Sequence, residues 1–275
     1  MTRVALFGAG GKMGYRLSRN LLKSDYAVRH VEPSPAGRER VKKDLGIDCV
    51  DQEAALAGAD IVILAVPDTL IRKISHQVAP SMKSGTMMVI LDAAAPFAGH
   101  LPDRKDLTYF VTHPCHPLIF YNEAREEVIT DHFGGLYARQ SIVNALMQGP
   151  ESDYAKGEAV ARAIWAPILR SHRVTVDQMA LLEPGLSETV GATLVAVMRE
   201  ALDEVIARGV DPVAARDFIL GHLNILLAVT FNEIEGRFSD ACNKAIEFGK
   251  PALMRSDWKH VFEHDEIAAS IKRIT

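Results

Sequence analysis

The feature that most constrains the fold of this chain is the glycine-rich segment VALFGAGGKMG, which runs from Val4 to Gly14. A short apolar run comes first, glycines follow at positions 8, 11 and 14, and apolar residues then recur at helical spacing. This order predicts a strand, a tight turn and a helix. Glycines in such a turn let the backbone approach a pyrophosphate, which is attracted by the free N–H groups and the positive dipole end of the helix.

A second strand-like segment, AVRHVE, ends at Glu32. A carboxylate at this place accepts hydrogen bonds from ribose hydroxyls and repels a 2′-phosphate, so the pattern predicts a site for NAD rather than NADP. Four basic residues could instead hold a phosphate, although an exposed helix face explains them better: Arg38, Arg40, Lys42 and Lys43. A glycine-rich turn without a ligand is the alternative interpretation. The residues expected to contact the dinucleotide here are Gly8, Ala9, Gly10, Gly11, Lys12, Met13 and Glu32.

Alternating strand and helix patterns continue to about residue 180 and predict a doubly wound, Rossmann-type α/β sheet. Ligands in such sheets bind outside the carboxyl ends of the strands. We therefore expect residues 113–116 to face the cofactor crevice, together with Val66, Pro67 and Asp68, of which Asp68 should also cap the next helix. The expected strands lie at 61–67, 86–92, 108–113, 141–147 and 173–177, with a helix over 154–169.

The pattern changes beyond Leu182, where apolar residues recur at three- and four-residue steps. One long helix is expected from about residue 188 to Gly209, and Pro212 begins a second that could run past Glu233. The sequence therefore predicts a Rossmann-like NAD-binding domain at 1–181 and an all-α domain at 182–275. Because the apolar faces of the long helices are too wide for so small a domain to cover, we expect a homodimer.

Composition limits the class of protein. The 275 residues are 48% hydrophobic and carry a formal charge of −4, which is typical of a soluble enzyme of two modest domains that acts on a small molecule. The mild negative charge argues against nucleic acid as a partner. The three scattered cysteines indicate free thiols in a reducing compartment, so we expect the cytoplasm. No apolar run approaches a membrane span in length, and no signal-peptide layout precedes the first strand, so no membrane partner is expected.

Two histidines in VTHPCHPL, His113 and His116, follow a predicted strand at the cofactor end of the sheet. Prolines beside them stiffen the segment, so each imidazole can be held in one direction. Histidine is suited to acid–base work near neutral pH and to metal ligation, and we leave open which of the two is the base. Two surface histidines without a function are the alternative. Cys115 between them is expected to point into the fold.

Glu183 and Glu188 flank a Pro-Gly pair at the start of the long helix. Carboxylates there are favourable merely as partners of the helix dipole, which is the alternative to a functional role. If this helix returns to the crevice, Glu188 approaches the histidines, and a mixed imidazole and carboxylate set can hold a divalent metal with positions left for a hydroxy acid. His222 lies on an apolar helical stripe, where a core histidine is the commoner interpretation, and Lys244 precedes a glycine break.

GAGGKMG, ILAVP and the THP of THPCHP, in this order, resemble the dehydrogenase superfamily that includes prephenate and 6-phosphogluconate dehydrogenases. In prephenate-type enzymes a histidine followed by proline meets the substrate, a role that the resemblance implies for His113. The second half resembles ketol-acid reductoisomerase more loosely. That resemblance implies a metal carboxylate at Glu188, a further ligand near His222 and a functional segment around Lys244, while the four-carboxylate set for two metals is incomplete here.

Over nearly its full length the chain resembles the D-apionate oxidoisomerases, most specifically in GAGGKMG, THPCHP and the EPGLSE helix start. The resemblance implies that NAD oxidises a branched 2,3-dihydroxy sugar acid and that the carboxylate group migrates to give 3-oxo-isoapionate. With the placement above, it also implies one divalent metal ion held by His116 and Glu188, with His113, His222 and Lys244 around the substrate. A plain NAD-dependent hydroxy-acid dehydrogenase without a metal, and a non-catalytic NAD-binding regulator, are the competing hypotheses.

Overall fold

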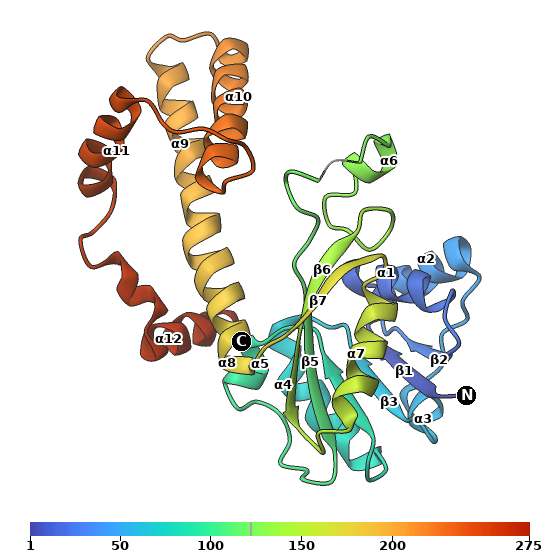
Figure 1. The fold of residues 1–275 in the computed structure, drawn as a ribbon. Coiled ribbons are helices and arrows are strands. Elements are labelled where there is room, and N and C mark those ends of the chain that lie inside the picture. The colour runs from blue at the N-terminus through green and yellow to red at the C-terminus, as the bar shows by residue number, and fades with distance from the viewer. Residues whose placement is uncertain (122) are drawn as a thin grey trace. The chain divides into compact units, whose positions relative to one another are not determined.

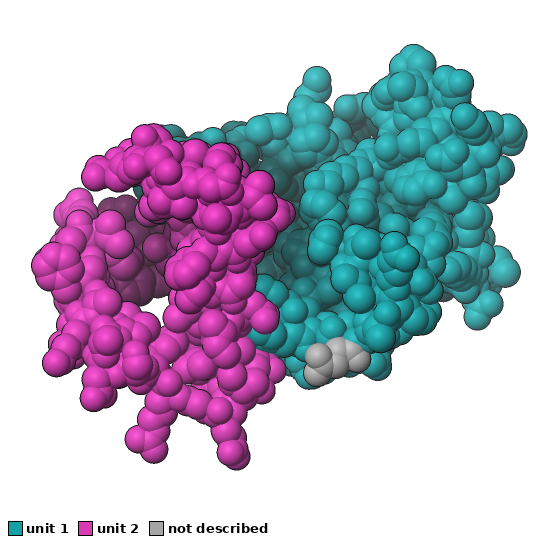
Figure 2. All heavy atoms as spheres, turned by 90° about the horizontal axis from the view of Figure 1, so that it is seen from above, with its two compact units in different colours: residues 1–183, 268–275 teal, residues 184–267 magenta. Residues whose placement is uncertain are grey.

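The computed structural model of the chain describes residues 1–121 and 123–275. These residues form two compact units, which Figure 2 shows in separate colours. Unit 1 comprises Met1–Glu183 and Ala268–Thr275, and unit 2 comprises Pro184–Ile267. A Rossmann-type sheet with flanking helices lies in unit 1, and unit 2 is helical, which confirms the predicted fold class.

Unit 1 is built around a seven-stranded sheet in the order β2-β1-β3-β4-β5-β6-β7 (Figure 1). Strands β1 to β5 run parallel, whereas β6 pairs antiparallel with β5 and parallel with β7. Because β1 lies between β2 and β3, the strand order reverses there, and sheets of this kind bind ligands at the carboxyl ends of those strands. The strands are β1 (Arg3–Phe7), β2 (Ala27–Val31), β3 (Ile61–Leu64), β4 (Met87–Ile90), β5 (Thr108–Pro114), β6 (Gln140–Gln148) and β7 (Ile168–Arg173).

Helices cover both faces of this sheet, because successive strand residues point to opposite faces. Helices α1 and α7 pack on the face that carries Leu6, and α3, α4 and α5 pack on the face that carries Phe7. Leu17 of α1 is 0% exposed, and burying one leucine side chain fully stabilises a fold by about 1.5–3 kcal/mol. The helices of this part are α1 (Lys12–Leu21), α2 (Pro35–Leu45), α3 (Gln52–Leu56), α4 (Asp68–Val78), α5 (Ala94–Phe97), α6 (Glu126–Ile129), α7 (Asp153–Ile164) and α8 (Val176–Ala180).

The end of the sheet differs from the sequence prediction. The helix expected over 154–169 stops at Ile164, and β7 occupies Ile168–Arg173 instead of the predicted 173–177. Pro167 explains both differences, because it lacks a backbone N–H and disfavours helical dihedral angles at the residue before it. The apolar residues Ile168 and Leu169, which continued the helical pattern, therefore begin the last strand.

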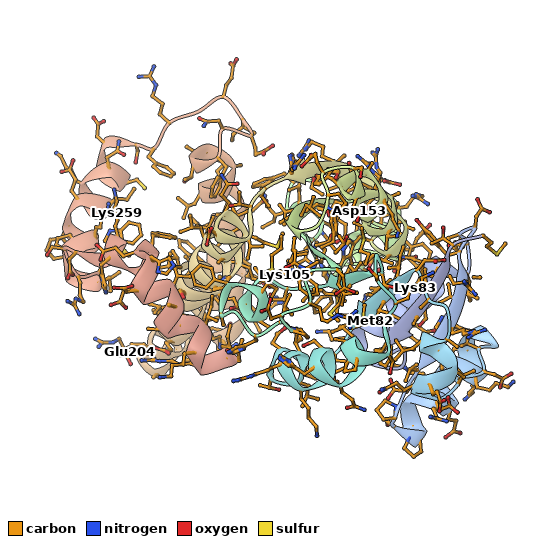
Figure 3. All side chains as sticks on the ribbon, turned by 90° about the horizontal axis from the view of Figure 1, so that it is seen from below. Met82, Lys83, Lys105, Asp153, Glu204 and Lys259 are labelled. Carbon is orange, nitrogen blue, oxygen red and sulfur yellow. The ribbon has the colours of Figure 1, made fainter. Side chains whose placement is uncertain are left out.

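The amino-terminal edge of the sheet carries charges that are paired with one another. Asp60, just before β3, accepts a hydrogen bond from the Arg3 backbone N–H (2.9 Å) and forms an ion pair with Lys83 (2.6 Å), which is labelled in Figure 3. These two contacts lower the pKa of Asp60. Asp68 and Asp92, at the carboxyl edge, have raised pKa values, which marks that edge as the candidate site.

The chain beyond β7 is mainly helical. A π-helical segment leads directly into α9, so helical structure begins before the predicted start near residue 188. Helix α10 begins at Pro212 as predicted, with the Asp211 carboxylate accepting hydrogen bonds from the N–H groups of Val213 (3.0 Å) and Ala214 (2.9 Å), and it ends before Glu233. The elements are the π-helical segment Leu181–Ala192, α9 (Thr193–Ala207), α10 (Pro212–Thr230), α11 (Asp240–Leu253) and α12 (His264–Ile274).

The expectation that no apolar run approaches a membrane span in length is wrong. Helix α10 has 19 residues with a mean hydropathy of 1.4, so by length and composition it could cross a membrane. After Asp217 its main polar side chains are His222 and Asn224, and the helix is therefore apolar on more than one face. Only 11% of this apolar stretch is buried within the chain. A single helix of this kind is weak evidence for a membrane, because a helix in a subunit interface has the same composition.

Candidate active site

The glycine turn between β1 and α1 is shaped by close backbone contacts. Gly8 has φ +78°, and a Cβ built on it would lie 2.2 Å from the Ala65 carbonyl oxygen at the end of β3. A Cβ on Gly14 would lie 1.9 Å from the Gly8 oxygen. Helix α1 begins after Gly11, which offers no side-chain cap, so the first-turn N–H groups that include those of Lys12 and Met13 lack intrahelical partners. This turn can therefore bind a pyrophosphate.

Glu32, at the end of β2, is bonded to this turn. Its carboxylate accepts hydrogen bonds from the backbone N–H groups of Gly10 (2.7 Å) and Ser34 (2.9 Å), and the residue is 5% exposed. The N–H groups of Gly8 (2.9 Å) and Ala9 (3.1 Å) both donate to the Val31 carbonyl. A carboxylate has about four acceptor positions, so two remain for ribose hydroxyls. Glu32 thus holds the glycine turn, in addition to the predicted contact with the cofactor, which stays a prediction.

The segment after β3 supplies the other predicted cofactor residues. Val66 and Pro67 precede α4, and the cap position belongs to Pro67. Asp68 is the first residue of the helix and makes no side-chain cap bond, so the prediction that it caps α4 is wrong. Burial, followed by the charge of Asp92, raises the pKa of Asp68 to about 6.

His113, in β5, is held through both ring nitrogens. Its Nδ1–H donates to the Leu91 carbonyl (2.7 Å), and its Nε2 lies 2.9 Å from Glu183 Oε1. Asp92 Oδ2 lies 4.0 Å from Nδ1. Because a carbonyl only accepts, Nδ1 must carry a proton, and the Glu183 contact then favours a second proton on Nε2.

The charges of this cluster are strongly coupled. Burial alone lowers the pKa of His113, but the hydrogen bond and negative charge of Glu183 outweigh it and raise this pKa to about 8. Burial and the neighbouring Glu183 carboxyl raise the pKa of Asp92 to about 7. Glu183 Oε2 is buried and lacks a hydrogen-bond partner within the described chain. Ligand atoms of Asp92, His113 and Glu183 lie within 4.8 Å of one another, so this cluster can hold a proton or a cation.

His116 lies three residues further along, in a backbone conformation that is uncommon for a non-glycine residue (φ +60°). Its Nδ1–H donates to the Phe133 carbonyl (2.9 Å), and burial lowers its pKa. The neutral ring therefore carries a lone pair on Nε2, as a metal ligand or a base requires. Its centroid lies 6.4 Å from that of His113. Cys115 is exposed, so the expectation that it points into the fold is wrong.

The remaining predicted residues lie in unit 2, on separate helical segments. Glu188 belongs to the π-helical segment, His222 to α10 and Lys244 to α11. His222 is exposed and stacks on Phe218 with ring centroids 4.0 Å apart, which differs from the core histidine that its apolar stripe suggested. The grouping of these residues with His113 and His116, and the metal pair His116 and Glu188, stay predictions.

Sequence reasoning missed Asp92 and gave Glu183 no specific role in the site. Asp92 stands two residues beyond the end of β4, and an acid just after a buried strand was the available signal. Glu183 is 70 positions from His113 in the sequence, and only the folded chain brings the two within hydrogen-bond distance. The structure therefore adds two carboxyl groups to the candidate site.

Comparison with known proteins identifies the family. Residues 121–275 match the family described as phosphogluconate dehydrogenase (decarboxylating) C-terminal, and residues 3–96 match NADP oxidoreductase, coenzyme F420-dependent. The D-apionate oxidoisomerase of Cupriavidus necator is 68% identical over 99% of both chains. A solved Cupriavidus necator protein, described as a semialdehyde dehydrogenase NAD-binding protein in complex with calcium and NAD, is 68% identical over 100% of both chains, with a TM-score of 0.98.

A more distant likeness concerns the fold alone. An NADH-preferring ketol-acid reductoisomerase from an uncultured archaeon has a TM-score of 0.70 at 16% identity and covers 99% of this chain, which spans 82% of that protein. Its fold agrees with the looser resemblance seen in the second half of the sequence. The full-length identity to the Cupriavidus necator oxidoisomerase is far above what a shared fold alone requires. The chain therefore belongs to the D-apionate oxidoisomerase family.

Proposed function

We propose that this chain oxidises D-apionate with NAD and rearranges its carbon skeleton to 3-oxo-isoapionate. The observation that carries this proposal is the 68% identity to a D-apionate oxidoisomerase over 99% of both chains. The chain is thus an enzyme, an NAD-dependent oxidoreductase and isomerase acting on a small sugar acid. The solved protein of equal identity binds NAD and calcium, which supports NAD and one divalent metal ion as the cofactors here.

The residues present fit NAD. The close backbone contacts at Gly8 and Gly14 fix the shape of the glycine turn, and the first-turn N–H groups of α1, which lack intrahelical partners, can bind a pyrophosphate beside it. Glu32 keeps acceptor positions for the adenosine ribose and repels a 2′-phosphate. Asp68, after β3, borders the same switch point of the sheet. NAD is therefore the expected dinucleotide.

The proton chemistry falls to Glu183 and His113. Hydride leaves C2 of the substrate for the nicotinamide, and the C2 hydroxyl must lose its proton at the same time. Glu183 Oε2 is a buried acceptor that a substrate hydroxyl would satisfy, and His113 beside it stabilises the carboxylate before transfer. The proton then resides in the cluster of Asp92, His113 and Glu183. The product of this step is a 2-keto acid next to a tertiary alcohol.

The second step rearranges this keto acid without further oxidation. The tertiary hydroxyl at C3 loses its proton, and a hydroxymethyl carbon moves with its bonding pair from C3 to C2. C3 becomes the new carbonyl, and the former C2 carbonyl oxygen takes up a proton to become a hydroxyl. The carboxylate keeps its bond to C2, which becomes the branched carbon, so the net change is the carboxylate migration that the family resemblance implies. A divalent metal, when bound, stabilises the negative charge on the two adjacent oxygens by several kcal/mol.

Two donor sets are candidates for the metal. The predicted pair is His116, whose Nε2 is open because Nδ1–H is engaged with Phe133, and Glu188. The convergence of Asp92, His113 and Glu183 within 4.8 Å favours a second set. Calorimetric titration with Mn²⁺ separates them: Glu188→Gln weakens binding if the first set holds the ion, and Glu183→Gln weakens it if the second does.

Incubation of the protein with NAD and D-apionate, with and without chelator, tests the function. Formation of NADH together with 3-oxo-isoapionate, lost on chelation, is the expected result. NADH formation that survives chelation and yields only an unrearranged keto acid would establish the plain dehydrogenase instead. Absence of turnover with every sugar acid, despite NAD binding, would favour the non-catalytic regulator.

We also propose that the protein is a homodimer in the cytoplasm. Helices α9 and α10 expose apolar side chains, including Val195 (65%), Val213 (67%) and Phe218 (68%), and between them lies an apolar cavity of about 350 Å³. A second copy packing on this surface would remove it from water. All three cysteines are free thiols, which suits a reducing compartment. Sedimentation equilibrium at micromolar concentration measures the mass of the assembly.

A further inference from the structure

A short segment between β5 and β6, Asp131–Ala138, lies against the cationic face of α1. We call it the aromatic strap. The Phe133 ring centroid is 3.7 Å from Lys12 Nζ and 5.1 Å from the Arg16 guanidinium carbon. The Tyr137 ring centroid is 5.2 Å from the guanidinium carbon of Arg19. The three cations recur at steps of four and three residues, so they share one face of α1.

The strap has a defined internal structure. The Asp131 carboxylate is 7% exposed, and its Oδ2 accepts hydrogen bonds from three successive backbone N–H groups, those of Leu136 (3.1 Å), Tyr137 (2.8 Å) and Ala138 (3.1 Å). Gly134 and Gly135 adopt φ of +68° and +78°, which turns the chain back towards this carboxylate. These hydrogen bonds and turns fix the backbone of the strap, and with it the position of Phe133.

Phe133 also contacts His116, one of the candidate catalytic residues. Its carbonyl accepts the Nδ1–H of His116, and the two rings meet edge to face with centroids 5.8 Å apart. Its ring also lies beside two cations of α1, Lys12 and Arg16. Arg16 Nε is buried and has no hydrogen-bond partner within the described chain. A donor in this state, one turn from the start of α1, needs a partner from outside the protein, either a water or an anionic group of a ligand.

We propose that Phe133 is a positioning residue that holds Lys12 and Arg16 for the NAD pyrophosphate while its backbone orients His116. The inference rests on the proposed function for the identity of the dinucleotide. Lys12 is the first residue of α1, and the pyrophosphate binds at that helix end. Cation–π contact restricts both side chains to the neighbourhood of the ring, so less of their motion is lost when NAD binds. One residue thereby serves both the cofactor and His116.

Calorimetric titration of the whole protein with NAD and with ADP-ribose tests this role. Phe133→Leu should weaken both ligands about threefold to tenfold, because it removes the aromatic face but keeps an apolar side chain. Phe133→Tyr should restore both affinities, since its ring also binds cations. Tyr137→Leu is the matched control: it removes the same kind of contact from the same strap, at Arg19, and should stay within about twofold of the natural protein.

Three outcomes would overturn the inference. The first is an NAD affinity of Phe133→Leu equal to that of the natural protein. The second is a Tyr137→Leu variant that binds NAD as weakly as Phe133→Leu does. The third is a Phe133→Leu variant that binds NAD more weakly but ADP-ribose as tightly as the natural protein. Thermal unfolding of each variant separates a local effect from general destabilisation. Phe133→Met, which also removes the aromatic face and keeps an apolar side chain, replaces Phe133→Leu if that variant does not fold, and the same weakening is expected. The expected NAD and ADP-ribose affinities of the variants do not depend on turnover of D-apionate. The turnover assay therefore tests the proposed function, and the calorimetric titrations test this inference.

Discussion

Replacing Glu183 with glutamine removes one negative charge from the cluster with His113 and keeps the size of the side chain. In the natural protein the hydrogen bond and charge of Glu183 overcome the effect of burial and raise the pKa of His113 to about 8. Without that charge burial dominates, and we expect the pKa of His113 in Glu183→Gln to fall below its ordinary value of 6.5.

The pKa shift of His113 can be converted into a difference in free energy between its charged and neutral forms. A rise of the His113 pKa from 6.5 to about 8 corresponds to about 2 kcal/mol in favour of the charged ring. Because the folded-state pKa is the higher one, this stabilisation is fully present below pH 6.5 and is lost as the pH rises through about 8. Glu183→Gln should therefore lower the free energy of unfolding more at pH 6 than at pH 9.

Carbon-13 labelling of the histidine rings and NMR titration measure this pKa directly. His113→Gln assigns the resonance among the ten histidines. His30 is an internal reference, because burial lowers its pKa to about 4 and it lies far outside the cluster. Glu123→Gln, which removes an acid paired with Arg125, is the matched control and should leave His113 unchanged. A pKa near 8 in Glu183→Gln would refute the assignment of the shift to this carboxylate.

Three further predictions concern other parts of the molecule. Gly14→Ala should abolish NAD binding in calorimetry and destabilise the fold by about 1–3 kcal/mol, because the new Cβ would lie 1.9 Å from the Gly8 oxygen; normal binding would contradict the close approach. Glu32→Ala loses the hydrogen bonds to Gly10 and Ser34, so thermal unfolding should show about 2 kcal/mol lower stability. The variant should also prefer NAD over NADP less strongly, and an unchanged melting temperature would remove Glu32 from this role. Phe218→Asp places a charge on the exposed face of α10 and should produce monomers in sedimentation; a dimer of unchanged affinity would locate the interface elsewhere.

Local patterns were sufficient for the fold class, the family and NAD as the cofactor. The strand, glycine turn and helix near the N-terminus are set by residues within a few positions of one another, and the three- and four-residue apolar steps beyond Leu182 predict helices in the same way. His113 could be placed at the carboxyl edge because parallel strands end together. The exceptions were local too: Pro167 ended α7 early, and the polar residues of α10 were too few to break its apolar run.

The chemical environment of the site was decided only by tertiary structure. Glu183 and His113 are 70 positions apart in the sequence, and no spacing rule relates them; their 2.9 Å contact depends on the path of the chain through β6, α7 and β7. Phe133 reaches Lys12 because a buried carboxylate folds the strap back on α1. Burial then determines the pKa values, since desolvation and the nearest charge depend on neighbours in space. The sequence determined which residues carry side chains suited to catalysis or binding, and the tertiary structure determined which of these side chains lie within hydrogen-bond distance of one another.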